Sequence, residues 1–131
     1  EELPENVKAI IADCGYTSEW DEFKCEANAL HIPWFPVLNA ASVMSKLRDG
    51  YDFKQASALE KVKQSRIPTL FIHGSDDELV PYSMLDKLYS AAACEKECLT
   101  VNGAGHALSS SVEPELYWNT VENFIEKYLE K

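Results

Sequence analysis

The chain has 131 residues, of which 46% are hydrophobic, a composition that suits one soluble globular domain or part of one. Its 12 Lys and Arg are outnumbered by 22 Asp and Glu, and the resulting net charge of −10 at pH 7 opposes binding to nucleic acid and to anionic membranes. No apolar run approaches the roughly 20 residues of a membrane-spanning helix, and the chain does not start with a signal peptide, so we expect no membrane contact from this chain and a cytoplasmic location.

The four cysteines lie at positions 14, 25, 94 and 98 and form none of the Cys-x-x-Cys pairs that are typical of structural zinc sites. We therefore predict no metal site. A disulfide framework would need more cysteines in a shorter chain, which favours a reducing compartment.

Three short apolar runs are predicted to be strands. Val7–Cys14 and Thr69–His73 are rich in β-branched residues and each is followed by a glycine, as expected for strands covered on both faces. Cys98–Val101 is a weaker candidate that ends before Asn102 and Gly103. The sequence thus predicts about three parallel strands.

More than fifty residues separate the first two predicted strands, too many for a simple crossover, and we expect an inserted helical cap over about residues 19–56. The prolines and aromatics of Leu30–Pro36 suit a segment folded over a cleft better than a regular helix. Asn39–Asp49 is predicted to be an amphipathic helix that ends at Gly50, and a further helix is predicted to begin at Ser57 with a capping box.

Two later segments, Pro81–Ala92 and Pro114–Leu129, place their apolar residues at helical spacing. Strands and helices therefore alternate along the chain. This order predicts an α/β fold with a parallel sheet and flanking helices.

Two loops that follow predicted strands carry residues suited to acid–base chemistry. Asp77 lies in the loop after Thr69–His73, and His106 lies in the loop after Cys98–Val101, between small residues. Because parallel strands present their carboxyl ends at one edge of a sheet, we expect the carboxylate and the imidazole to meet there. Gly103 and Gly105 are expected to let the second loop turn sharply.

The segment HGSDDELVP, followed by GAGHA, resembles the acid loop and the histidine loop of the α/β-hydrolase family. VKAIIADCGYTS is similar to the strand and loop that follow the nucleophile helix in that family, among bacterial esterase and serine-aminopeptidase branches. The resemblance implies that the chain is the C-terminal half of an α/β-hydrolase fold. It also implies that Asp77 is the acid and His106 the base of a catalytic triad.

The chain departs from the family pattern because it contains no Gly-x-Ser-x-Gly nucleophile turn. Its serines are predicted to be helix caps and turn residues. Asp76 remains an alternative to Asp77, and His73 and His31 are interpreted as structural. Cys14 is a weak candidate for a substitute nucleophile, since nothing around it resembles a strained turn.

Four aromatic residues of the cap are either core residues or the lining of an apolar substrate pocket: Trp20, Phe23, Trp34 and Phe35.

The resemblance implies cleavage of a small-molecule ester or amide by a Ser-Asp-His triad whose serine lies outside this chain, without a cofactor. The chain alone is then expected to be inactive, and a membrane anchor elsewhere in the protein stays open. The alternative hypothesis is a non-catalytic fragment or interaction module. An exposed strand edge would let it self-associate.

Overall fold

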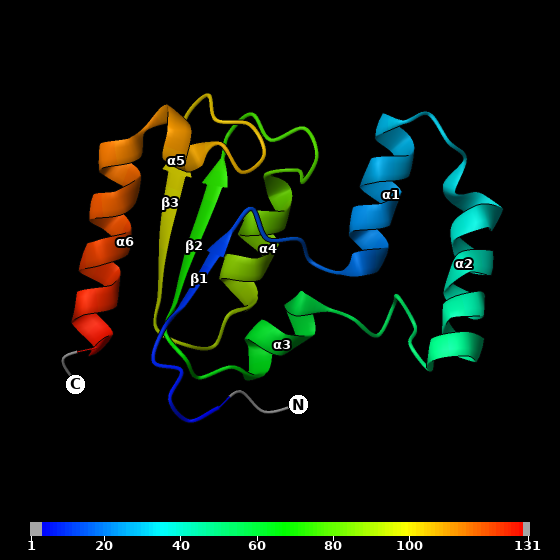
Figure 1. Ribbon diagram of the computed structural model, residues 1–131, viewed down its shortest axis with the longest axis horizontal. Helices are drawn as coiled ribbons and strands as arrows, with labels where there is room; N and C mark the ends of the chain where they lie inside the picture. The colour runs from blue at the N-terminus through cyan, green and yellow to red at the C-terminus, as the bar shows by residue number, and fades with distance from the viewer. Residues whose placement is uncertain (1–3, 130–131) are drawn as a thin grey trace.

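Three parallel strands form the centre of the computed structural model, which describes residues 4–129. They lie in the order β1-β2-β3, so β2 is the central strand (Figure 1). The strands are β1 (Ile10–Asp13), β2 (Thr69–Gly74) and β3 (Lys96–Val101), and the helices are α1 (Glu19–Ala29), α2 (Trp34–Asp49), α3 (Ala58–Gln64), α4 (Ser83–Ala91), α5 (Ser109–Val112) and α6 (Pro114–Leu129).

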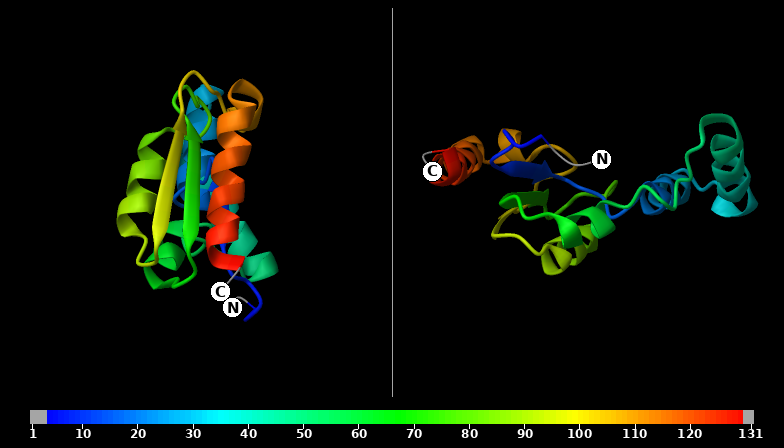
Figure 2. Two further views of the ribbon diagram at one scale, coloured as in Figure 1. Left: turned by 90° about the vertical axis from the view of Figure 1, so that its left-hand side faces the viewer. Right: turned by 90° about the horizontal axis from the view of Figure 1, so that it is seen from below.

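Helices cover both faces of the sheet, with α4 on one side and α6 on the other (Figure 2). On one face, Leu70 and Ile72 of β2 pack against buried residues of α6, including Val121 and Phe124. On the other face, Phe71 packs against side chains of α4 and α3. Every residue of β2 is buried, which explains why its sequence is continuously apolar instead of alternating. The structure therefore confirms the predicted α/β fold with three parallel strands and flanking helices.

The starts of β1 and β3 differ from the predicted ones by two or more residues, and the ends of β1 and β2 each differ by one residue. β1 begins at Ile10, not Val7, because its partner strand begins at Thr69, directly after a proline that has no N–H to donate. β3 begins two residues earlier than predicted, at Lys96, since that residue pairs in register with Thr69. Pairing with β2 thus determines where both outer strands begin.

The helical caps follow the sequence signals only in part. The hydroxyl of Ser57 accepts a hydrogen bond from the Glu60 N–H at 3.2 Å, so the predicted helix start is confirmed. The reciprocal half of the capping box is missing, because the Glu60 carboxylate pairs with Lys63 and the Ser57 N–H donates to the Gln55 carbonyl. Gly50 ends α2 at a φ of 71°, as predicted.

Helices α1 and α2 connect β1 to the rest of the fold and extend away from the sheet (Figure 1). Ser18 caps α1 by accepting a hydrogen bond from the Asp21 N–H at 3.1 Å. Helix α2 begins at Trp34, five residues before the predicted start at Asn39, and its backbone is non-helical only at Phe35 within the segment expected to be irregular. The apolar residues Val43 and Met44 share the predicted face of α2 but are exposed to solvent in this chain.

Of the helices in the described part of the chain, none combines the length and the apolar character that crossing a bilayer requires.

Candidate active site

The acid loop leaves the carboxyl end of β2 and folds around the side chain of Asp77. One carboxylate oxygen, Oδ1, accepts hydrogen bonds from the backbone N–H groups of Leu79 and Val80, at 3.0 and 2.8 Å. The side chain is completely buried. Burial alone would raise the pKa of Asp77, but the Val80 N–H and His106 outweigh it, and the pKa lies below its usual value. The loop therefore stabilises a buried carboxylate.

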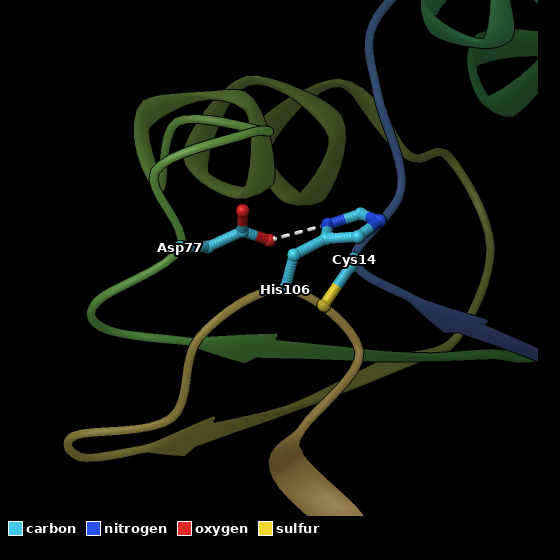
Figure 3. A group of neighbouring side chains, drawn as sticks. All are labelled: Cys14, Asp77 and His106. Carbon is cyan, nitrogen blue, oxygen red and sulfur yellow. Dashed lines mark hydrogen bonds and ion pairs between the residues drawn. The ribbon is translucent and has the colours of Figure 1, made fainter.

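The histidine loop leaves the neighbouring strand β3 and brings His106 to this carboxylate. Nδ1 of His106 lies 2.9 Å from the second carboxylate oxygen, Oδ2 of Asp77 (Figure 3). Because a carboxylate only accepts hydrogen bonds, Nδ1 donates, and we infer that a neutral ring leaves Nε2 unprotonated. The His106 side chain is 37% exposed, so solvent reaches it while the carboxylate stays covered.

The positive backbone angles of this loop fall partly where the sequence indicated. Gly103 has a φ of 74°, as expected for a tight turn. Gly105 does not have a positive φ; the second positive φ, 56°, is at Ala107. The loop therefore turns on both sides of His106, and one turn is not at a glycine.

Backbone contacts hold the two loops together. The Asp76 N–H donates to the Ala104 carbonyl at 3.0 Å, and the Ser75 hydroxyl accepts from the Gly103 N–H at 2.8 Å. The carboxylate of Asp76 accepts a hydrogen bond from the Ser75 hydroxyl at 2.6 Å. The Asp76 carboxylate thus interacts with its own loop, whereas the Asp77 carboxylate interacts with His106.

A second histidine lies behind Asp77. His73, near the end of β2, is completely buried. Its Nε2 lies 2.9 Å from the Val80 carbonyl and 3.3 Å from Oδ2 of Asp77, and Nδ1 has no partner among residues 4–129. His31, in contrast, is exposed at the turn between α1 and α2. The proximity of His73 to Asp77 was not predicted, although the two are four residues apart in sequence.

Cys14, which the sequence analysis considered only as a substitute nucleophile, is a third neighbour of the pair. It follows β1 at a φ of 52°; its thiol donates to the Asp13 carboxylate and accepts from the Ala107 N–H, both at 3.3 Å. Burial raises the pKa of the thiol to about 11, so it is a poor nucleophile at neutral pH. The donor atoms of Cys14, Asp77 and His106 lie within 4.8 Å of one another, close enough to hold one metal ion.

The predicted aromatic residues of the cap divide into two groups. Phe23 and Trp34 line an apolar pocket of about 360 Å³ between α1 and α2. Trp20 lies under the ammonium group of Lys54, and Phe35 is largely exposed. The pocket is lined by α1, α2 and nearby residues; neither Asp77 nor His106 lines it.

Comparisons with known proteins identify relatives of this chain. No family model matches the chain. It is 30% identical over 117 residues to the uncharacterized protein YqkD of Bacillus subtilis, covering 88% of this chain and 38% of that protein. It is also 30% identical over 106 residues to alpha/beta hydrolase domain-containing protein 17C of Xenopus tropicalis, covering 79% of this chain and 34% of the relative.

Among solved structures, an esterase of Pyrococcus furiosus superposes with a TM-score of 0.70 over 95% of this chain and 47% of the esterase, at 18% identity. The chain and the esterase therefore share a fold although only 18% of their aligned residues are identical. The chain spans about a third of the length of the curated relatives it matches, and those relatives include bacterial and vertebrate proteins.

Proposed function

Because this chain belongs to the α/β-hydrolase family, we propose that it forms the C-terminal part of a serine hydrolase that cleaves an ester or amide bond. Asp77 would be the acid and His106 the base of the triad, and the serine would lie outside these residues. The 2.9 Å hydrogen bond between Oδ2 of Asp77 and Nδ1 of His106 carries the proposal. It fixes the tautomer that a general base requires, with Nε2 free to accept a proton.

The proposed reaction is acyl transfer to water. Nε2 of His106 takes the proton of the serine hydroxyl as the serine oxygen attacks the substrate carbonyl. Asp77 stabilises the resulting imidazolium, and His106 then donates the proton to the leaving group. Water then hydrolyses the acyl-enzyme. Nε2 of His106 takes a proton from the attacking water and donates it to the serine oxygen as the acyl group leaves. The chemistry requires only these side chains and no cofactor.

We further propose that residues 19–56 act as a cap that selects a small, modestly hydrophobic substrate. The pocket between α1 and α2 is lined by apolar side chains, among them Phe23, Leu30 and Trp34. Its volume of about 360 Å³ falls within the range typical of small-molecule sites. An apolar acyl or side-chain group fits this lining better than a charged one.

Ester hydrolysis by the full-length protein tests the proposal. With a p-nitrophenyl ester, His106→Ala and Asp77→Asn are each expected to lower kcat by about 10³-fold or more, because both residues act on the same proton transfer. His31→Ala is the matched control, since that histidine lies exposed at a turn and should not matter. The isolated 131-residue chain should be inactive. Full activity in the His106→Ala variant would exclude the triad assignment.

A non-catalytic interaction module remains the second candidate, and the edge position of β1 favours it. β1 pairs with β2 on one side, and its other side has no strand partner among the described residues. Unpaired strand edges promote association with a second copy. Under this hypothesis, light scattering of the isolated chain at several concentrations should show dimers or larger species, and a strict monomer would contradict it. A Gly-x-Ser-x-Gly motif encoded upstream of residue 1 would favour the hydrolase.

A further inference from the structure

A thiol, a carboxylate and an imidazole converge from three separate loops at the carboxyl edge of the sheet. Figure 3 shows Cys14 beside the hydrogen-bonded pair of Asp77 and His106. Their donor atoms lie within 4.8 Å of one another. The proposed hydrolase reaction uses only two of these groups, which leaves the position of the thiol unexplained.

The spacing of the three donors is close to that of a tetrahedral metal site. Zn²⁺ binds sulfur at about 2.3 Å and nitrogen or oxygen at about 2.0 to 2.2 Å, which places neighbouring donor atoms roughly 3.3 to 3.8 Å apart. Starting from donors within 4.8 Å, one ion could be enclosed by movements of about 1 Å. Side-chain rotation alone can supply displacements of that size.

The three donor atoms face one another, and Oδ2 of Asp77 also lies 3.3 Å from Nε2 of His73. Oδ1 of Asp77 is held by two backbone N–H groups, so Oδ2 is the oxygen that faces the imidazole. The Ala107 N–H donates to Sγ of Cys14 and holds the sulfur beside the carboxylate and the imidazole. His106 is partly exposed, which gives an ion a route from solvent and a position for water as the fourth ligand.

We propose that Cys14, Asp77 and His106 form a Zn²⁺-binding site, and that bound Zn²⁺ inhibits the enzyme. A mixed sulfur, nitrogen and oxygen donor set selects Zn²⁺ over Mg²⁺ and Ca²⁺, which prefer oxygen alone. Binding releases one proton to solvent, from the thiol, while the Nδ1 proton of the neutral His106 ring moves to Nε2. The thiol also gives up its hydrogen bond to Asp13.

Inhibition follows because an ion on Nδ1 of His106 moves the ring proton to Nε2, the nitrogen that must be unprotonated to accept the serine proton. Zn²⁺ between Oδ2 of Asp77 and Nδ1 of His106 replaces the hydrogen bond that orients the base. Only this inhibitory effect rests on the proposed hydrolase function; binding itself does not. A protein without ester hydrolysis can therefore still be tested for the site.

Binding is tested on the purified chain, with Zn²⁺ by calorimetry and with Co²⁺ by absorption spectroscopy. A tetrahedral Co²⁺ ion with a thiolate ligand shows sulfur-to-cobalt charge-transfer absorption. We expect one equivalent of either metal to bind, with that absorption present. Cys14→Ser, which keeps the size of the side chain, should lose the absorption and bind Zn²⁺ about tenfold more weakly or worse.

Cys98→Ala is the matched control, because Cys98 is exposed on β3 and should leave binding and absorption unchanged. Circular dichroism verifies that each variant is folded. In the full-length protein, Zn²⁺ should inhibit ester hydrolysis, a chelator should restore it, and Cys14→Ser should be less sensitive. Absence of saturable binding, or a charge-transfer band that survives Cys14→Ser, would overturn the site. Loss of activity in all forms would count only against the hydrolase.

Discussion

Gly74, the last residue of β2, lies directly against the carbonyl group of Ala104 in the histidine loop. A Cβ atom at Gly74 would be 2.1 Å from that oxygen and 2.7 Å from its carbon. The Ala104 oxygen also accepts the Asp76 N–H, so this close approach couples the acid loop to the histidine loop. Only glycine permits it, because both contacts are to backbone atoms that cannot rotate away.

Gly74→Ala is therefore expected to destabilise the protein and to displace the histidine loop. Overpacking of this kind costs about 1 to 3 kcal/mol of unfolding free energy. Urea denaturation measures the loss. Gly15→Ala is the control, since its Cβ would meet only the Leu88 side chain at an ordinary 3.5 Å. Equal stability of Gly74→Ala and the wild type would mean that the two loops are not packed this closely.

The pKa of Asp77 should make stability depend on pH in the acid range. Its pKa is lower in the folded protein than the unfolded value of about 3.9, so the folded state holds this proton less tightly. The resulting stabilisation is present above about pH 4 and is lost as the pH falls through the folded pKa. Asp77→Asn should flatten this part of the curve in urea denaturation between about pH 2 and 6.

Asp76→Asn is the control, because it removes a charge from the same loop without touching the hydrogen bond to His106. An unchanged acid slope in Asp77→Asn would show that this carboxylate is not stabilised as the contacts indicate.

Thiol reactivity should separate the buried and exposed cysteines. Cys14 is only 5% exposed and burial raises its pKa to about 11, so very little thiolate is present near pH 8. Iodoacetamide should label the exposed Cys98 in the native protein and Cys14 only after unfolding in urea. Peptide mass spectrometry identifies the labelled residues. Native labelling of Cys14 at the rate of Cys98 would contradict the buried position.

The sequence predicted the sheet and the last helix because these elements carry strong local signals. The apolar stripe of α6 falls on buried residues such as Tyr117 and Phe124, and the helix has the predicted bounds. The starts of β1 and β3 were less accurate, since each depends on where the partner strand begins rather than on local composition.

Helix α1 was not delimited from the sequence, and the environment of α2 was not anticipated. None of the α1 side chains is fully buried, so no clear apolar stripe marks the helix. The apolar face of α2 contains Leu47, which is 83% exposed in this chain. Periodicity predicts that a face is apolar, but it does not say what covers it.

The meeting of Asp77 and His106 could be predicted because two neighbouring parallel strands end at the same edge. The contacts of Cys14 and His73 with this pair could not, since they depend on side-chain direction in three dimensions. A cysteine after an apolar strand and a histidine before a glycine are common structural residues. The sequence around these two residues does not predict that they lie beside Asp77 and His106.

Tyr117 of α6 forms a hydrogen bond to Asp13, the last residue of β1. This contact should make the stability of the protein depend on pH in the alkaline range. The Tyr117 hydroxyl donates to the Asp13 carboxylate at 3.0 Å. Burial, followed by this hydrogen bond, raises the pKa of Tyr117 to about 12, above the unfolded value of about 10. The folded state thus holds the phenol proton more tightly. The stabilisation is present below about pH 10 and is lost as the pH rises through about 12.

Tyr117→Phe removes both the hydrogen bond and the ionisable group. At pH 7 we expect a loss of about 1 kcal/mol of unfolding free energy, the usual contribution of one hydrogen bond. Between about pH 10 and 12 the variant should lose less stability than the wild type, because no phenol at this position ionises on unfolding. Tyr89→Phe is the control, since the Tyr89 hydroxyl makes no hydrogen bond to any residue that the structure describes. An equal loss of unfolding free energy in wild type and Tyr117→Phe above pH 10 would show that the hydrogen bond to Asp13 does not raise the pKa of Tyr117.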